Sequence, residues 1–301
     1  MDADASFYIL RAATSGSEIT LIVGEVEYND RAIFCPTEDT NKMKMNTYSD
    51  IFNKHKMQVN PVLTFYNDGP TISELIGGYI ARWPDVDTCV ASTRYRLWKI
   101  SDYSAITHIK NEMAAIKRVY IADGNHRFLM FNKRSMKADA RIVAAITDSG
   151  AITVKSFHRV ITGALPRNWV TELATNFIVR KTSTEHMTEG GILMMLDTME
   201  MYELIPKSYD HTVPIYDVVR DSIIHETLKL TDDMVFAVPG NLNVSDAGRI
   251  FDLYKGGTAI IFVPNMTMTN FIKIVDSGGK LPPTSTWIEP KIIDGFLVRK
   301  Y

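Results

Sequence analysis

Strand-type and helix-type hydrophobic patterns alternate along this chain, and this alternation limits the folds it can adopt. Residues 7–28 contain two β-type runs around Ser15-Gly16-Ser17, which predicts a hairpin. Residues 60–68 have the apolar, β-branched composition of a buried strand, and residues 71–82 have the spacing of a short helix. Because both periods recur, we expect an α/β fold of the mixed α+β kind.

The pattern changes after residue 165, where helical spacing becomes more frequent. We therefore predict a core at residues 1–165 and a helix-rich region at residues 166–301, whose C-terminal strands complete the site. The sequence contains no disordered linker at this point, so the boundary is soft and the two parts could share a sheet.

Three further elements follow from local patterns. Residues 140–162 predict a second hairpin that turns at Asp148-Ser149-Gly150. The Met-rich run at residues 191–205 is expected to be a helix, and a closing hairpin is expected around Asp294-Gly295.

The stretch RVYIADGNHRFLMF, residues 118–131, joins an apolar strand pattern to a helical one through Asp123-Gly124. We expect the strand to end at Ala122 and the helix to begin near Asn125. A helix N-terminus presents unpaired backbone N–H groups and a partial positive charge, so such a junction can bind an anion.

The side chains next to this junction suit a phosphate. Arg127 offers a planar fork that matches phosphate oxygens, and His126 can donate a hydrogen bond. Asp123 would repel a phosphate unless it holds Mg²⁺ or caps the helix. The alternative is an ordinary strand–turn–helix connection with a solvated His-Arg pair, and the local pattern leaves both interpretations open.

Composition excludes several classes of function. The 301 residues are 46% apolar and carry 33 basic and 35 acidic side chains, so no strong positive field would attract nucleic acid. The two cysteines have no metal-binding or disulfide-framework spacing, which is typical of a reducing compartment. No apolar run reaches the roughly 20 residues of a membrane span, and the first residues lack signal-peptide features. We expect a cytoplasmic protein without membrane or nucleic-acid partners.

Several segments together resemble the domain-of-unknown-function family 1015. YIADGNHRFLM resembles that family's YIADGHHR signature, and FYILR, TEDTNKMKM, NPVLTFYND and SFHRVI occur in the family's order. The end of the chain, LPPTSTWIEPKIIDGFLVRK, is similar to the family's ending. The chain differs by having Asn125 in place of the signature's first histidine, Thr37 in place of a histidine before glutamate, and Thr284 in place of a lysine.

The resemblance implies a ParB/sulfiredoxin-like core related to the free-serine kinases, with a nucleotide site at the signature. It implies that Glu38 is the base, that Asp123 is a metal or hydroxyl partner, and that the residues from Gly124 to Arg127 hold phosphates. Chemistry is consistent with this, because a carboxylate can orient a serine hydroxyl and accept its proton. Apart from this base, phosphoryl transfer mainly needs positioned cations and N–H donors.

Two further segments supply candidate residues. Near Glu38, Thr40, Lys42 and Lys44 could meet phosphate oxygens, although without the resemblance the pattern favours a solvated, capped helix start. Ser285, Thr286 and Lys291 could bind substrate or phosphate after a rigid Pro-Pro turn. The alternative there is a Ser/Thr turn that enters a strand.

We therefore expect a nucleotide-dependent kinase that uses ATP or ADP with Mg²⁺ and phosphorylates a small hydroxyl substrate, first of all free L-serine to O-phospho-L-serine. The alternatives are a ParB-like switch that binds or hydrolyses nucleotide without a small acceptor, and a catalytically dead scaffold. The loss of the signature's first histidine, at Asn125, favours the switch.

Overall fold

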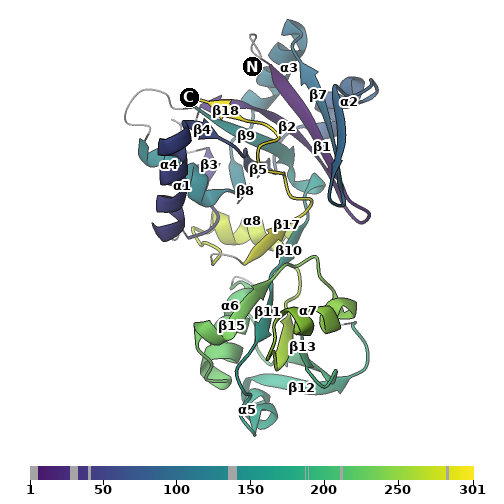
Figure 1. Cartoon of the computed structure of the whole chain (residues 1–301), viewed down its shortest axis with the longest axis vertical. Helices are drawn as coiled ribbons and strands as arrows, with labels where there is room; N and C mark the ends of the chain where they lie inside the picture. The colour runs from purple at the N-terminus through teal and green to yellow at the C-terminus, as the bar shows by residue number, and fades with distance from the viewer. Residues whose placement is uncertain are drawn as a thin grey trace. The chain divides into compact units, whose positions relative to one another are not determined.

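The computed structural model describes residues 6–27, 33–39, 42–134, 141–186, 188, 190–210, 213–282 and 285–301. The chain divides into two compact units: Met1–Thr153 with Ile288–Tyr301, and Val154–Trp287. Helices and sheets occur in both units, which confirms the expected mixed α/β class (Figure 1). The sequence-based boundary at residue 165 lies inside the second unit. None of the helices in the described part of the chain is long and apolar enough to cross a membrane.

The first unit is built on an eight-stranded mixed sheet. In spatial order its strands are β3 (Phe34–Cys35), β8 (Val119–Asp123), β5 (Val62–Tyr66), β9 (Arg141–Asp148), β2 (Glu18–Glu27), β1 (Phe7–Ala13), β7 (Thr93–Ile100) and β6 (Val86–Val90). The pairs β3–β8 and β5–β9 are parallel, and the other neighbours are antiparallel. The hairpin predicted at the start of the chain is confirmed as β1–β2.

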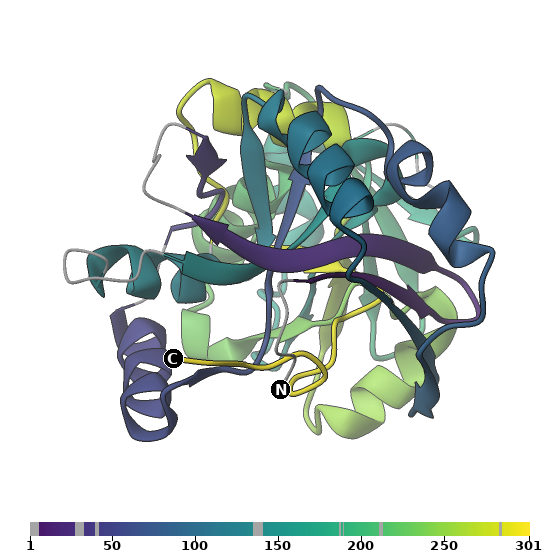
Figure 2. The same cartoon turned by 90° about the horizontal axis from the view of Figure 1, so that it is seen from above.

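Two pairs of helices cover this sheet. The helices α2 (Ile72–Ile80) and α3 (Tyr103–Ala114) pack on β1, β2 and β7 around buried Trp98 (Figure 2). The helices α1 (Lys42–His55) and α4 (Asn125–Arg134) pack together over β5, β8 and β9, with Phe128 and Ile121 in their core. The C-terminal strand β18 (Arg299–Lys300) pairs with β4 (Met57–Gln58), so the chain ends in the first unit. Between β9 and the second unit lies a short 3-10 helix, η2 (Ser149–Ala151).

The second unit contains a six-stranded antiparallel sheet. Its strands in spatial order are β12 (Phe177–Thr182), β14 (Met201–Pro206), β13 (Ile192–Leu196), β16 (Ala259–Phe262), β11 (His158–Ile161) and β15 (Val235–Val238). A separate pair joins β10 (Val154–Ser156) to β17 (Thr286–Ile288). The helical elements are α5 (Trp169–Asn176), α6 (Ile215–Asp217), the π-helix η3 (Val218–Thr227), η4 (Asp232–Met234), η5 (Val244–Asp246), α7 (Ala247–Leu253) and α8 (Met268–Asp276).

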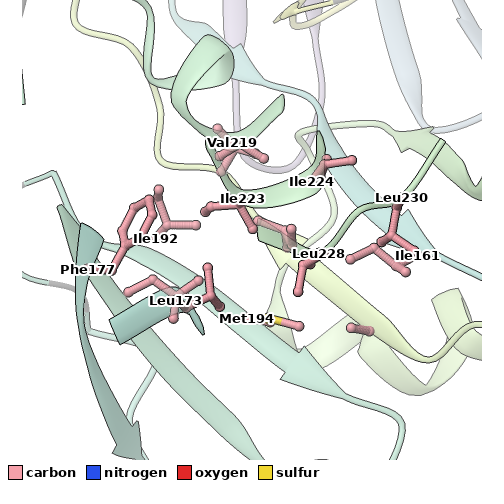
Figure 3. Packing of buried hydrophobic residues seen from close by; sticks show 14 of the residues in the cluster. Ile161, Leu173, Phe177, Ile192, Met194, Val219, Ile223, Ile224, Leu228 and Leu230 are labelled. Carbon is pink, nitrogen blue, oxygen red and sulfur yellow. The ribbon is translucent and has the colours of Figure 1, made fainter. Parts of the chain in front are cut away.

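One buried cluster of this unit lies between η3 and the sheet, and another packs Ile250 of α7 against strand residues such as Leu193. Ile223 and Leu228 are buried against strand residues such as Ile192 and Met194 (Figure 3). The N–H of Leu228 bonds to the carbonyl of Ile223 at 2.8 Å, which closes the π-type turn at the end of η3.

Three local predictions are wrong. Residues 191–205 form the strands β13 and β14 and not a helix, because a strand buried on both faces shows a continuous apolar run that periodicity cannot separate from a helix. Residues 140–162 form no hairpin: β9 pairs with β2 and β5, while Asp148 caps η2 by accepting the N–H of Gly150 at 3.0 Å. No closing hairpin forms around Gly295, whose N–H instead bonds to the carbonyl of Val59.

Candidate active site

The predicted strand–turn–helix junction is confirmed. The strand β8 ends at Asp123 and α4 begins at Asn125, so Gly124 alone makes the turn, with φ of +98°. L-residues with a side chain rarely adopt this conformation, which explains the glycine. As at any helix start, the first backbone N–H groups of α4 have no carbonyl partner within the helix, and this helix start directly follows the end of β8.

Arg127 is folded back over this turn. Its Nη2 donates to Asp123 Oδ2 and to the carbonyl of Pro61, each at 3.3 Å, and its guanidinium lies 5.9 Å from the ring centre of Tyr48. The side chain is 13% exposed, and its buried Nε has no hydrogen-bond partner among the described residues. A Cβ on Gly124 would lie 2.7 Å from Nη2, so the missing side chain leaves the space that the guanidinium fills.

Asp123 lies between two cations. Its Oδ2 accepts from Arg127, and its Oδ1 is 3.8 Å from Nζ of Lys291. Burial opposes ionisation, but the charges of Lys291 and Arg127 outweigh it and hold the pKa of Asp123 below its usual value. The carboxylate is therefore charged at neutral pH, and it is still 42% exposed to solvent.

Lys291 reaches this carboxylate from the C-terminal segment. The carbonyl of Lys291 accepts a 2.9 Å hydrogen bond from the hydroxyl of Tyr95, which ties this segment to β7. In the first unit, the structure thus brings Lys291 together with the signature, although 164 residues separate it from Arg127 in the sequence (291 − 127).

The segment that carries Glu38 also ends at the junction. Because β3 runs parallel to β8, the two strands leave the sheet at the same edge. Thr37 then donates its hydroxyl to the carbonyl of Ile121 at 2.6 Å and its N–H to Asn125 Oδ1 at 2.9 Å. Asn125 Nδ2 donates in return to Thr37 Oγ1 at 3.2 Å. Glu38, the next residue, is therefore beside the first turn of α4 and is partly exposed.

The other predicted site residues fall into three groups. Ser285 and Thr286 belong to the second unit, where Ser285 is 3% exposed and its Oγ has no hydrogen-bond partner among the residues that the structure describes. Thr40 and Thr284 lie outside the described residues. Lys42 and Lys44 lie in the first turn of α1, and the description there covers their backbone only.

His158 has a structural environment in the second unit. Its Nδ1 accepts the N–H of Val263 at 3.1 Å, so Nε2 carries the proton and donates to the carbonyl of Leu242 at 3.0 Å. Burial is the main cause that lowers the pKa of His158 to about 4, so the ring is neutral near pH 7. It is a satisfied core histidine.

A cavity of about 880 Å³ also lies in the first unit, and none of the signature residues line it. Its walls come from β1, β2, β9, α3 and residues 296–300. We place the candidate site at the signature because three segments bring charged and hydrogen-bonding groups together there.

Magnesium fits this site only when a bound nucleotide shares in holding the ion. Among the described residues, no group of three or more His, Cys, Asp or Glu side chains gathers where an ion could be held. Mg²⁺ commonly uses one or two carboxylates together with substrate phosphates, and Asp123 offers one ionised carboxylate. An ion shared between Asp123 and a nucleotide therefore fits, on condition that it displaces Lys291 from Oδ1.

Sequence reasoning missed the groups that hold the signature in place. Tyr48, Pro61 and Tyr95 contact Arg127 or Lys291, and no motif marks them. The one sequence signal for Thr37 is that it, like Asn125, stands where the pattern that the chain resembles has a histidine.

Comparison with known proteins agrees with the resemblance. The model of the family described as a protein of unknown function (DUF1015) matches residues 1–234. A free serine kinase variant in complex with ADP is 12% identical with a TM-score of 0.50, covering 88% of this chain and 87% of that one. A variant in complex with AMP is 12% identical with a TM-score of 0.51, covering 88% and 86%. At this identity the likeness concerns the fold. No curated protein matches the sequence.

Proposed function

The chain belongs to the DUF1015 family, and we propose that it is a nucleotide-dependent kinase that phosphorylates a small hydroxyl compound, with free L-serine as the first candidate. The observation that carries the proposal is the arrangement at the end of β8. There Arg127 covers a helix N-terminus, and the Glu38 segment is hydrogen-bonded to the first residue of that helix. The solved structures with this fold include free serine kinases bound to ADP and AMP, which supports a nucleotide as the ligand.

The first turn of α4 would hold the phosphates. The backbone N–H groups of Asn125 and His126 would meet the phosphate at the helix start, where the helix dipole favours negative charge, whereas the N–H of Gly124 also donates to the Asp123 carboxylate. Arg127 has a buried Nε that no described residue satisfies, and its Nη2 contacts are long at 3.3 Å. A phosphate oxygen would give the guanidinium shorter, charge-assisted bonds. Thr40, Lys42 and Lys44 are further candidates for phosphate contacts.

Glu38 would act on the acceptor. Its carboxylate orients the serine hydroxyl and takes its proton as the hydroxyl oxygen attacks the terminal phosphorus of the nucleotide. The bond from that phosphorus to the bridging oxygen breaks, and the shortened nucleotide leaves with the electron pair. Arg127 and the N–H groups of α4 stabilise the charge that spreads over the transferred oxygens.

Asp123 and Lys291, both in the first unit, would complete the site. Bound Mg²⁺ would neutralise phosphate charge, with Asp123 as its protein ligand. Lys291 would then be released from Asp123 to hold an anionic group of the substrate.

One observation favours the second candidate, a nucleotide-binding or nucleotide-hydrolysing switch without a small acceptor. In the structure both oxygens of Asp123 already face cations, and the side chain of Asn125 is committed to Thr37. A switch would bind nucleotide with an affinity that L-serine does not change, whereas a kinase would form O-phosphoserine. An inactive scaffold would bind neither nucleotide nor L-serine.

Calorimetric titration of ATP and ADP tests the phosphate site directly. We expect Arg127→Ala to weaken binding by about 10- to 100-fold, since a charge-assisted hydrogen bond contributes about 1.5–3 kcal/mol. Arg220→Ala is a matched control, because Arg220 also pairs with an aspartate one turn away (Asp217, 2.9 Å) and lies 5.9 Å from a tyrosine ring centre. Equal nucleotide affinity in wild type and Arg127→Ala would refute the phosphate site.

A further inference from the structure

Thr37 and Asn125, two residues at which this chain differs from the pattern that it resembles, are hydrogen-bonded to each other. Thr37 and Asn125 lie 88 positions apart in the sequence and share two hydrogen bonds, one in each direction. The substitutions are thus two halves of one contact. They replace two titratable rings with a hydroxyl and an amide, neither of which changes charge between pH 5 and 8.

This contact is buried and well satisfied. Thr37 is 1% exposed and Asn125 is 3% exposed. The Thr37 hydroxyl accepts from Asn125 and donates to the carbonyl of Ile121, so both functions of the oxygen are used. Buried polar groups with all partners present hold one geometry, because any displacement leaves a donor or acceptor unpaired.

The contact also limits where Glu38 can be. Neighbouring Cα atoms are about 3.8 Å apart, so fixing both the backbone and the side chain of Thr37 fixes the start of the Glu38 residue. The partner of Thr37 is the first residue of α4, whose N–H groups form the proposed phosphate site. One contact therefore sets the distance from the carboxylate-bearing segment to that site.

We propose that the Thr37–Asn125 pair is a positioning clamp that holds Glu38 in register with the phosphate site. This inference rests on the proposed kinase function. It assigns the side chain of Asn125 to Thr37, which leaves only the backbone N–H of Asn125 for phosphate. Neither side chain touches the reacting atoms, and both side chains act through Glu38.

Kinetics of the full-length protein with nucleotide, Mg²⁺ and L-serine test the clamp. Thr37→Val keeps the shape of the side chain and removes its hydroxyl, and Asn125→Ala removes the partner. We expect either change to lower kcat by about 10- to 100-fold, as misplacing a reacting group by 1 Å does. The Kd for nucleotide should stay within about threefold of wild type, and Thr37→Ser should keep most of kcat.

Two comparisons separate positioning from general destabilisation. Thr227→Val is a matched control in the second unit, because Thr227 is 6% exposed and its hydroxyl donates to the carbonyl of Ser222 at 2.6 Å, the same length as the Thr37 bond. Thr227→Val should lower the free energy of unfolding by an amount similar to that for Thr37→Val and leave kcat unchanged. In a Glu38→Gln background, Thr37→Val should lower the residual kcat no further, since no carboxylate remains to be positioned.

Each outcome identifies what has failed. If wild type forms no O-phosphoserine, the proposed function fails and the clamp has no carboxylate role to serve. If wild type is active and Thr37→Val or Asn125→Ala keeps kcat within about twofold, the clamp alone is wrong. The clamp would also be overturned if the losses of kcat from Glu38→Gln and Thr37→Val add in the double variant. A strongly raised nucleotide Kd in Asn125→Ala would overturn it as well.

Discussion

Replacing Gly124 with alanine would change both the backbone and the charge arrangement at the end of β8. The residue has φ of +98°, a region that residues with a side chain adopt only under strain. The new Cβ would also lie 2.7 Å from Nη2 and 3.1 Å from Nε of Arg127, closer than ordinary van der Waals contact. Because the helix start fixes the backbone, the guanidinium is the group that must move.

The two effects have different magnitudes and different readouts. Backbone strain of this kind costs about 1–3 kcal/mol of unfolding free energy, reduced by about 0.4–1 kcal/mol because alanine restricts the unfolded chain. Moving the guanidinium removes a charge-assisted contact to phosphate that contributes about 1.5–3 kcal/mol. We therefore expect Gly124→Ala to weaken nucleotide binding by about 10- to 100-fold.

Urea unfolding and calorimetric titration of ADP measure the two effects separately. Gly278→Ala is the matched control, since Gly278 has φ of +83° and an added Cβ there would meet nothing within 4 Å. Both variants should lose similar stability, and only Gly124→Ala should lose nucleotide affinity. The reasoning is refuted if Gly124→Ala binds ADP as wild type does, or if Gly278→Ala weakens binding equally.

Three further predictions concern individual side chains. The pKa of His158 is about 4 in the folded protein and 6.5 in the unfolded chain, so the unfolded chain binds more protons between these two pH values. The free energy of unfolding of wild type, relative to that of His158→Gln, should therefore fall by about 3 kcal/mol as pH falls from 7 to 4. Urea unfolding at the two pH values measures this change. Lys291→Met should raise the pKa of Asp123 in an NMR titration, because Lys291 is the largest cause that lowers it, and should change stability by less than about 1 kcal/mol at this partly exposed pair; an unmoved Asp123 titration contradicts this. Ser285→Ala should leave stability unchanged or slightly higher in urea unfolding, because the buried Oγ has no described partner; a clear loss of stability contradicts this.

Local chemistry explains which parts of the site could be predicted from the sequence. The junction at Asp123 and Gly124 was predictable because an apolar run, a turn pair and a helical run follow each other within one short stretch. Helix α2 was predictable for the same reason, since Thr71 and Glu74 form a capping box at its start.

The failures come from tertiary context. The strands β13 and β14 read as a helix because both faces of β13 are buried, which removes the alternation that marks a strand. The contact between Thr37 and Asn125 was not predictable from spacing, because it depends on β3 lying parallel to β8 in the folded sheet. The approach of Lys291 to Asp123 likewise depends on the chain returning to the first unit at its end.

Formation of O-phospho-L-serine tests the central claim most directly. Wild type and Glu38→Gln are incubated with L-serine and Mg²⁺ and with either ATP or ADP, and the product is measured by mass spectrometry while nucleotide Kd is measured in parallel. We predict product from wild type with at least one donor, and a rate of product formation that is about 10²- to 10⁴-fold lower in Glu38→Gln with nucleotide Kd unchanged. No product from wild type with either donor, or full activity in Glu38→Gln, would contradict it.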